Sequence, residues 1–201
     1  MRINYIAVIR PDASVQANTV AEPAKRVIPW VVSSDMEPTV RVATRNDLGR
    51  INEIYNEYIV DSHTSFDTEA WTLSQRAEWF AKYDGGADRY QVLVIEVAGR
   101  IRGFASSSPF RHKVAYDSSV ETTIVLESNA TGSGLGRVLL EALIRRLAAA
   151  DVHRAYALIA LPNAPSIKLH RRLGYRAVGT LDEVGHKLDQ FHSVHIMELP
   201  L

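Results

Sequence analysis

The sequence predicts a mixed α/β domain in which one central sheet is flanked by helices. Three observations predict it: strand-like and helix-like hydrophobic periods alternate from Val40 onward, capping signals begin two helices, and a glycine-rich loop joins a strand to an amphipathic helix. The 201 residues are enough for one well-packed domain, and 46% hydrophobic with 23% charged residues is ordinary for a soluble globular protein. We expect this single domain to span residues 40–201.

The first 39 residues differ from the rest, because proline and serine interrupt them and no helical period survives. Two apolar stretches, Ile3–Ile9 and Val27–Val32, could each add a short strand to a sheet edge. We expect residues 1–39 to form a partly ordered extension. The apolar run Tyr5–Ile9 is too short for a signal-peptide core, and no segment approaches the length of a membrane span.

Four helices are expected, and local signals mark where they begin or end. The sequences Thr44-x-x-Asp47 and Thr72-x-x-Gln75 resemble capping boxes that begin the first two. The third follows the glycine loop, and the fourth begins near Pro165 and ends at Gly174. The apolar stripes of the first and third helices are Leu48, Ile51, Ile54, Tyr55 and Tyr58, and Leu139, Leu140, Leu143, Ile144 and Leu147.

Seven strands complete the domain, each a short run rich in β-branched and apolar residues. Gly99 separates two of these runs, which predicts a hairpin. The expected strands are residues 40–43, 91–97, 101–107, 120–126, 155–161, 177–184 and 193–199. The resulting order is β-α-α-β-β-β-α-β-α-β-β, a mixed α/β arrangement around one sheet.

The loop Gly132-Ser133-Gly134-Leu135-Gly136 is suited to phosphate, because glycine lets backbone N–H groups approach an anion at a positive helix end. A P-loop requires Lys-Ser/Thr after its last glycine, and here Arg137-Val138 follow. A dinucleotide fingerprint requires G-x-G-x-x-G with an acidic residue ending the next strand. Here the spacing is G-x-G-x-G, so the sequence disfavours both a P-loop and a dinucleotide-binding loop. An alternative interpretation of this glycine loop is a turn that only reverses the chain and binds no ligand.

A strand followed by x-G-x-G-x-G and a long helix resembles the GNAT superfamily of N-acetyltransferases. The similarity extends over residues 40–199 to the phosphinothricin and methionine sulfoximine acetyltransferase branch of that family. The segments that carry it are residues 54–59, 64–69, 116–125, 159–175, 179–181, 184–187 and 191–194. The resemblance implies a single GNAT-type domain whose central sheet is mixed and mostly antiparallel. It also implies acetyl-CoA as the co-substrate.

The resemblance assigns a set of residues to acetyl-CoA. The loop would bind the diphosphate, the strand edge at residues 124–126 would pair with pantetheine, and an amide after the next strand would bond the same arm. The cofactor-binding residues expected are Ile124, Val125, Leu126, Thr131, Gly132, Ser133, Gly134, Leu135, Gly136, Arg137, Asn163 and Ser166. The family usually has Gln or Arg where this chain has Thr131, and often a basic residue at Ser133. Backbone N–H groups must then carry most of the phosphate binding, and the affinity is expected to be weaker.

Two residues are expected to act on protons. Glu121 matches the family's general base, acting directly or through water, although an ordinary carboxylate is a weak base for an ammonium group. His170 stands four residues before the closing Gly174, where the wider superfamily has a tyrosine that protonates the leaving thiolate. Ordinary structural roles, a solvent-facing strand residue for Glu121 and a packed helical ring for His170, remain open.

The acceptor site is expected beside Glu121. An arginine fork at Arg111 would suit the carboxylate of an amino-acid acceptor, with Lys113 nearby. The resemblance places further acceptor contacts in the segments that contain Phe66 and His186. The full set expected to contact the acceptor is Phe66, Arg111, Lys113, Glu121, Thr122, Thr123, His186 and Lys187.

Composition limits the remaining classes of function. The chain has no cysteine, which excludes disulfides, thiolate metal sites and a cysteine acyl-enzyme and fits a reducing cytoplasm. The formal net charge of zero gives no field that would attract nucleic acid or a membrane. The seven histidines lack metal-ligand spacing, so we expect no metal.

The partner expected is therefore a small amino-acid-like acceptor of the phosphinothricin or methionine sulfoximine type. Another small amine, a peptide N-terminus, or a coenzyme A-binding module without catalysis remain alternatives. Related enzymes are commonly homodimers, and the resemblance implies the same here.

Overall fold

The computed structural model describes residues 7–8, 37–84 and 88–201 of the chain. Its strands are β1 (Ala7–Val8), β2 (Thr39–Val42), β3 (Val92–Val97), β4 (Arg100–Pro109), β5 (Ser119–Leu126), β6 (Arg154–Ala160), β7 (Arg176–Lys187) and β8 (Gln190–Pro200). Its helices are α1 (Leu48–Val60), α2 (Leu73–Ala81), α3 (Leu135–Ala148) and α4 (Ala164–Arg172). Three 3-10 turns join them at Arg45–Asp47, Val114–Tyr116 and Ser128–Ala130. The seven expected strands and four expected helices are all present.

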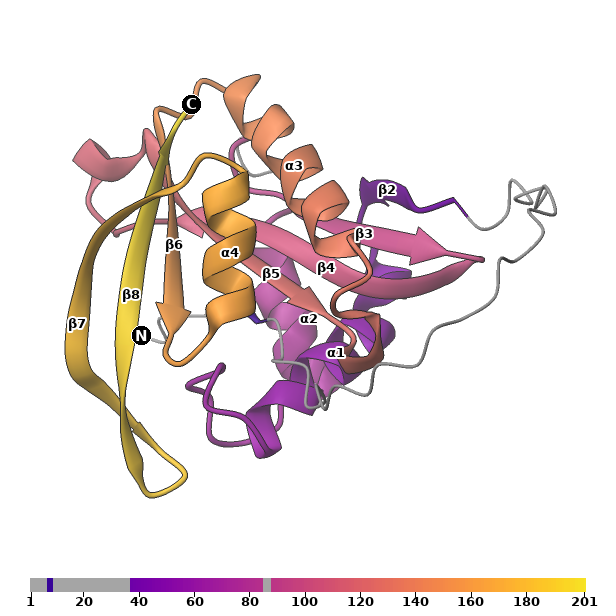
Figure 1. Cartoon of the computed structure of the whole chain (residues 1–201). Coiled ribbons are helices and arrows are strands. Elements are labelled where there is room, and N and C mark those ends of the chain that lie inside the picture. The colour runs from indigo at the N-terminus through magenta and orange to yellow at the C-terminus, as the bar shows by residue number, and fades with distance from the viewer. Residues whose placement is uncertain (1–6, 9–36, 85–87) are drawn as a thin grey trace, which may run out of the picture.

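The strands form one sheet in the order β2-β3-β4-β5-β6-β8-β7, with β1 paired to β5. Neighbours along this order are antiparallel except β5 and β6, which run parallel. The prediction of a central, mixed and mostly antiparallel sheet is confirmed. The helices lie in two layers, with α3 and α4 on one face and α1 and α2 on the other (Figure 1).

Each face of the sheet has its own hydrophobic core. On one face, Leu139 and Leu143 of α3 pack against Ile124 of β5. On the other, Ile54 of α1 and Phe80 of α2 pack in a cluster that includes Val125. Neighbouring residues of β5 therefore face opposite layers, as the period of a strand requires. All of β5 after its first residue is buried.

The capping signals in the sequence act as expected. Thr44 and Asp47 form a reciprocal capping box that begins a 3-10 turn leading into α1. Thr72 and Gln75 form a second one at the start of α2, where the Thr72 hydroxyl accepts a hydrogen bond from the Gln75 N–H. These boxes fix the entry of both helices onto one face of the sheet.

The C-terminal hairpin is longer than the sequence predicted, since the strands were expected to end at residue 184 and to resume at 193. In the structure they continue to Lys187 and from Gln190. Leu188 and Asp189 join them with φ of 53° and 55°, and two left-handed residues in succession are what a tight hairpin turn requires. The sequence lacks the Asn-Gly or Asp-Gly signal that usually marks such a turn.

The N-terminal extension contributes one described element. Strand β1 lies within the apolar stretch Ile3–Ile9 that was a strand candidate, but it pairs with β5 inside the sheet and not with a sheet edge. The second candidate, Val27–Val32, lies outside the described residues. The division of the chain at residue 40 stays a prediction.

The end of β5 is fastened to α1. The Tyr58 hydroxyl donates to the Leu126 carbonyl over 2.6 Å, and the Ser128 N–H donates to the Glu57 carboxylate over 3.1 Å. Glu127, which is 4% exposed, forms ion pairs with Arg50, Arg100 and Arg102. These contacts hold the point where the strand leaves the sheet and enters the glycine loop.

We predict that Tyr58→Phe lowers the free energy of unfolding by about 1–3 kcal/mol, because a buried carbonyl loses its donor without a change of shape. Urea denaturation measures it. The matched control is Tyr116→Phe, since Tyr116 is 43% exposed and lies far from this contact in the chain. Equal stability of both variants would mean that the Tyr58 hydroxyl does not anchor β5.

Candidate active site

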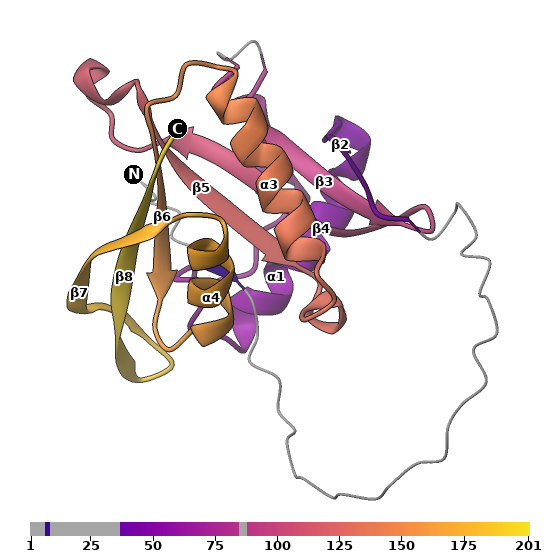
Figure 2. The same cartoon turned by 45° about the horizontal axis from the view of Figure 1, so that its top comes forward.

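The site is built around a separation of two parallel strands. β5 and β6 pair only from Ser119 to Glu121, opposite Arg154 to Tyr156. Beyond Glu121 they diverge, and Figure 2 shows the space between them widening towards the end of β5. Residues 122–126 keep their pairing with β4 on one side only. The other backbone edge of β5 is therefore open to an extended partner, and in this structure β1 pairs with it at Ile124 and Val125.

Glu121 lies where the two strands separate. Its side chain is 4% exposed and forms no hydrogen bond with the described residues. Burial raises the pKa of Glu121 to about 8, while the nearby Arg111 acts in the opposite direction. A carboxylate with a pKa near 8 is a much stronger base than an ordinary one, so this position is suited to proton abstraction near neutral pH.

Arg111 is held over a ladder of aromatic rings. Its guanidinium carbon lies 4.2 Å from the centre of the Phe110 ring, and its Nη1 donates to the Phe110 carbonyl over 2.8 Å. Phe110 in turn stacks on Tyr156 with the ring centres 4.2 Å apart. Tyr156 is the residue opposite Glu121 in the β5–β6 pairing. The structure therefore brings Arg111 and Glu121 together, as the sequence predicted.

The two threonines after Glu121 face different layers. Thr122 lies on the α4 side, where its hydroxyl is 3.0 Å from the Tyr175 hydroxyl and 3.1 Å from the Tyr156 carbonyl oxygen. Thr123 lies on the same face as Glu121 and lines a small cavity with Ser106 and Ser108. Only Thr123 of the two shares the Glu121 face.

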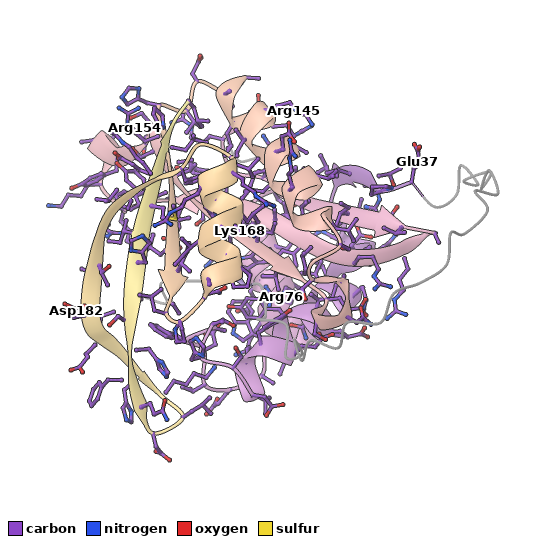
Figure 3. All side chains as sticks on the ribbon, in the orientation of Figure 1. Glu37, Arg76, Arg145, Arg154, Lys168 and Asp182 are labelled. Carbon is purple, nitrogen blue, oxygen red and sulfur yellow. The ribbon has the colours of Figure 1, made fainter. Side chains whose placement is uncertain are left out.

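Arg76 supports that face and was missed by sequence reasoning. Arg76, which is labelled in Figure 3, is 1% exposed, and its guanidinium carbon lies 4.3 to 4.8 Å from the ring centres of Tyr55, Trp71 and Trp79. It lines the same cavity as Thr123. Burial lowers the pKa of Arg76 to about 10, so it stays charged at neutral pH. The available signal was its position in α2, three residues before Trp79.

The glycine loop has the backbone that its composition predicts. Gly132 and Gly134 have φ of +78° and +88°, and a side chain at either position would meet no atom within 4 Å. Glycine is therefore required by the left-handed backbone, which leaves the loop surface open. Gly134 caps α3 without a side-chain hydrogen bond, so the first N–H groups of the helix remain available to a ligand.

Gly136 serves a different purpose from the other two glycines. It is buried in the first turn of α3, where a Cβ would lie 3.3 Å from Leu126 and 3.4 Å from Leu169. Its small size lets α3 begin close to the end of β5 and to α4. The helix N-terminus is thereby placed beside the open strand edge.

The two hydroxyls that replace the family's usual loop residues stabilise the turn itself. Thr131 Oγ1 donates to the Ser128 carbonyl over 3.1 Å, and Ser133 Oγ donates to the Ala130 carbonyl over 2.6 Å. Neither hydroxyl hydrogen is free for a phosphate in this conformation. The cation nearest to the loop in sequence is Arg137. Its side chain is 68% exposed, and its Nε lies 3.9 Å from Glu141 Oε2.

Asn163, Ser166 and His170 follow one another along α4. The Asn163 Oδ1 accepts from the Ser166 N–H over 3.2 Å and caps the helix. His170 is fully buried, and its Nδ1 lies 2.8 Å from the Ser166 carbonyl oxygen, which can only accept. The ring proton is therefore on Nδ1. The buried Nε2 has no hydrogen-bond partner among the described residues.

Burial lowers the pKa of His170 to about 4, so the ring is neutral near pH 7. Its Nε2 presents a lone pair and not a proton. A buried polar atom without a partner in a native site calls for a ligand or a water. His170 packs edge-on against Tyr175, with ring centres 4.9 Å apart, on the Thr122 side of β5.

Lys187 holds a loop in place. It is 6% exposed, and its Nζ donates to the Ser62 and Ser65 carbonyls over 2.8 and 2.6 Å. Phe66 follows this loop and lies so close to Gly185 that a Cβ there would be 2.3 Å from its ring. The two expected acceptor contacts Phe66 and Lys187 are thus brought together.

A pair of histidines extends this contact to the turn before α4. His63 stacks on His192 with ring centres 4.9 Å apart, and its Nε2 lies 3.0 Å from the Pro162 carbonyl oxygen. Pro162 immediately precedes Asn163. The loop that carries Phe66 is therefore linked to both the β7–β8 hairpin and the start of α4.

Two other expected acceptor residues lie apart from these groups. His186 is exposed on the opposite face of β7 from Lys187 and packs against Phe191, with ring centres 4.8 Å apart. Lys113 is exposed at the start of the Val114–Tyr116 turn. Their roles in acceptor binding stay predictions.

Two kinds of feature are absent from residues 7–8, 37–84 and 88–201. No three His, Cys, Asp or Glu side chains there are grouped so that they could hold a metal ion. No helix in the same part of the chain has the length and apolarity needed to cross a membrane.

Comparison with known proteins identifies the class to which this fold and site belong. The model of the acetyltransferase (GNAT) family matches residues 51–175. The chain belongs to this family of acetyltransferases, and the expected resemblance is confirmed.

Individual relatives show which acetyltransferases of this family the chain resembles. The chain is 42% identical to a phosphinothricin N-acetyltransferase of Streptomyces coelicolor over 82% of this chain and 97% of the relative. It is 34% identical to an L-methionine sulfoximine/L-methionine sulfone acetyltransferase of Pseudomonas aeruginosa, over 83% and 96%. A crystal structure of a phosphinothricin acetyltransferase from Sinorhizobium meliloti in complex with acetyl-CoA superposes with a TM-score of 0.78, at 31% identity over 83% and 89%.

We predict that Lys187→Met accelerates amide hydrogen exchange in residues 61–67, because two buried carbonyls lose their donor at a cost of about 1–3 kcal/mol. Lys187→Arg keeps a donor and should exchange more slowly than the methionine variant. His186→Ala, one residue away on the outer face, is the control and should match the wild type. Unchanged exchange in Lys187→Met would show that the ammonium does not hold this loop.

Proposed function

We propose that this protein transfers the acetyl group of acetyl-CoA directly to the amino group of a small amino-acid-like acceptor. The observation that carries the proposal is Glu121, a buried carboxylate with a raised pKa at the point where β5 and β6 separate. Membership of the acetyltransferase family and the printed activities of the relatives support the same reaction.

Glu121 is the general base of the proposed reaction. An amino-acid acceptor enters as an ammonium ion, and the Glu121 carboxylate takes one proton to free the lone pair. The nitrogen then attacks the thioester carbonyl carbon, the C–N bond forms and the C–S bond breaks. The second amine proton balances the charge of the leaving thiolate. One proton is released overall, and the transfer is direct, since the chain has no cysteine to form a cysteinyl acyl-enzyme.

The open edge of β5 is the proposed seat of the pantetheine arm, at Ile124, Val125 and Leu126. Its fitness for an extended ligand is supported by the pairing with β1. The Asn163 side chain is proposed to contact the arm. The loop at residues 131–137 receives the diphosphate through backbone N–H groups at the α3 N-terminus.

His170 has a narrower role in this proposal than the sequence suggested. A neutral ring with its proton on Nδ1 cannot give a proton from Nε2, so direct protonation of the thiolate by this atom is not part of the step. We propose that Nε2 accepts a hydrogen bond from a water or from the bound co-substrate. This role satisfies the buried atom that has no partner in the described residues.

The acceptor is proposed to be an acid of the phosphinothricin or methionine sulfoximine type. Arg111 supplies an exposed guanidinium beside Glu121, and Arg76 supplies a buried positive charge beneath the face that carries Thr123. Two positive groups flanking one base favour an acceptor that has an anionic or strongly dipolar group near its amine. Another amine or a peptide N-terminus remains an outcome of the acceptor assay.

We predict that kcat/KM for phosphinothricin rises about tenfold per pH unit below pH 8 and becomes constant above it, because Glu121 must lose its proton to act. Glu121→Gln should lower kcat/KM by about 10²–10⁴-fold and remove this pH dependence. Thiol release from acetyl-CoA measures both. Acetyl-CoA binding by Glu121→Gln is the control and should be unchanged.

Two results would contradict this account. Full activity of the Glu121→Gln variant would remove the assigned base. Tight coenzyme A binding without thiol release for phosphinothricin, methionine sulfone and a peptide amine would indicate a binding module without catalysis.

A homodimer is proposed to form through the β7–β8 hairpin. β7 is the last strand of the sheet, and the large apolar side chains exposed on this hairpin and its turn are Val178, Leu181, Val184, Leu188 and Phe191, each 43% to 64% exposed. An apolar group of this kind at a sheet end is typical of an association surface. We also propose a cytoplasmic location, which the absence of cysteine supports.

We predict that the double variant Val184→Asp/Phe191→Asp sediments as a monomer while the wild type sediments as a dimer, because two charges would be buried without partners. Sedimentation velocity measures the change. Val114→Asp, at an exposed site outside the hairpin, is the matched control and should remain a dimer. A monomeric wild type would refute the proposal.

A further inference from the structure

Strand β1 occupies a backbone edge that the proposed reaction requires. Ala7 lies opposite Ile124 and Val8 lies opposite Val125, in parallel register. β1 also lies next to β6, so it fills the space where β5 and β6 no longer pair. The proposed pantetheine seat and the seat of β1 therefore share Ile124 and Val125.

The backbone of β5 can serve one strand-like partner at a time on this edge. Its other edge is used by β4 along the whole stretch from Val120 to Leu126. Each peptide unit offers one N–H and one C=O, so an edge that pairs with β1 is not available to pantetheine. The two partners exclude each other by geometry, whatever their side chains.

We infer that the open edge of β5 is a peptide-binding site for the chain's own N-terminal segment, and that this segment and acetyl-CoA compete for it. The inference rests on the proposed seat of acetyl-CoA. A tethered occupant acts at a high local concentration and lowers the apparent affinity for a ligand by the fraction of molecules in which the edge is free. The co-substrate must displace β1 before transfer can begin.

The position of the pairing decides which kinetic constant is affected. Ala7 and Val8 pair at residues 124 and 125, three and four residues beyond Glu121. Occupation by β1 blocks co-substrate binding and leaves the base unchanged. A loss of β1 pairing should therefore lower KM for acetyl-CoA and leave kcat the same, because only the competition is removed.

The full-length variant Ala7→Pro/Val8→Pro tests the inference. Proline has no N–H, and in a strand successive N–H groups point to opposite sides, so replacing both residues removes the donor that faces β5. The control is Ala7→Ser/Val8→Thr, which changes both side chains and keeps both donors. Titration calorimetry with coenzyme A alone measures Kd without any turnover.

The proline variant should bind coenzyme A about tenfold more tightly than the wild type, and the serine–threonine control should equal the wild type. Tenfold corresponds to about 1.4 kcal/mol, the net contribution of one or two backbone hydrogen bonds. A synthetic peptide of residues 1–12, added to the proline variant, should weaken coenzyme A binding again in a competitive manner.

The calorimetric outcomes distinguish failure of the competition between β1 and acetyl-CoA from failure of the proposed function. Equal Kd values for the wild type and the proline variant, with coenzyme A bound by both, would overturn the competition and leave the proposed function intact. Absence of coenzyme A binding in every variant would overturn the proposed function and this inference together.

Discussion

The structure depends on the loss of pairing between β5 and β6 after Glu121. Up to that residue the two parallel strands share a ladder, and beyond it β5 keeps only β4 and β6 keeps only β8 of the neighbours they had before. An interior strand edge from which the neighbouring strand departs is unusual, because its backbone groups invite another chain, and here β1 pairs with them. The fold keeps the end of β5 apart from β6 by anchoring it elsewhere, through Tyr58 on Leu126 and the arginines around Glu127. The gap is therefore maintained by contacts outside it.

Burial explains the chemistry of Glu121 and His170. Glu121 and His170 are both buried, and burial disfavours the charged form of each. For the carboxyl group this raises the pKa towards the range of a useful base, and for the imidazole it lowers the pKa until the ring is neutral. One physical cause thus produces a proton acceptor on one face of β5 and an uncharged hydrogen-bond acceptor near the other.

Much of this could be predicted from the sequence, because the informative features were local. The capping boxes, Gly99 between two strands and the glycine loop each follow from a few adjacent residues, and their elements are where they were expected. Glu121 was found through a segment that resembles the family, and Arg111 through the fit of a guanidinium to an acceptor carboxylate. The pairing of Glu121 with Tyr156 explains why the two residues meet. The outer position of His186 follows from strand alternation, but only once the hairpin is known to reach residue 187.

Other features depended on contacts distant in sequence. Arg76 becomes informative only when Tyr55, Trp71 and Trp79 surround it, and these rings come from two helices and a loop. The Lys187 contact spans more than a hundred residues to Ser62 and Ser65. The seat of β1 was not foreseen, because apolar residues in Ile3–Ile9 indicate a strand without indicating which edge it pairs with.

The central claim is that the open edge of β5, beyond Glu121, binds acetyl-CoA. Amide hydrogen exchange of residues 122–127 tests it most directly. In the Ala7→Pro/Val8→Pro variant, whose β5 edge has lost the pairing with β1, the account predicts that coenzyme A slows exchange in this peptide and in the loop at residues 131–137, while the β7–β8 hairpin is unaffected. Protection confined to the loop, with no change along the end of β5, would contradict the account.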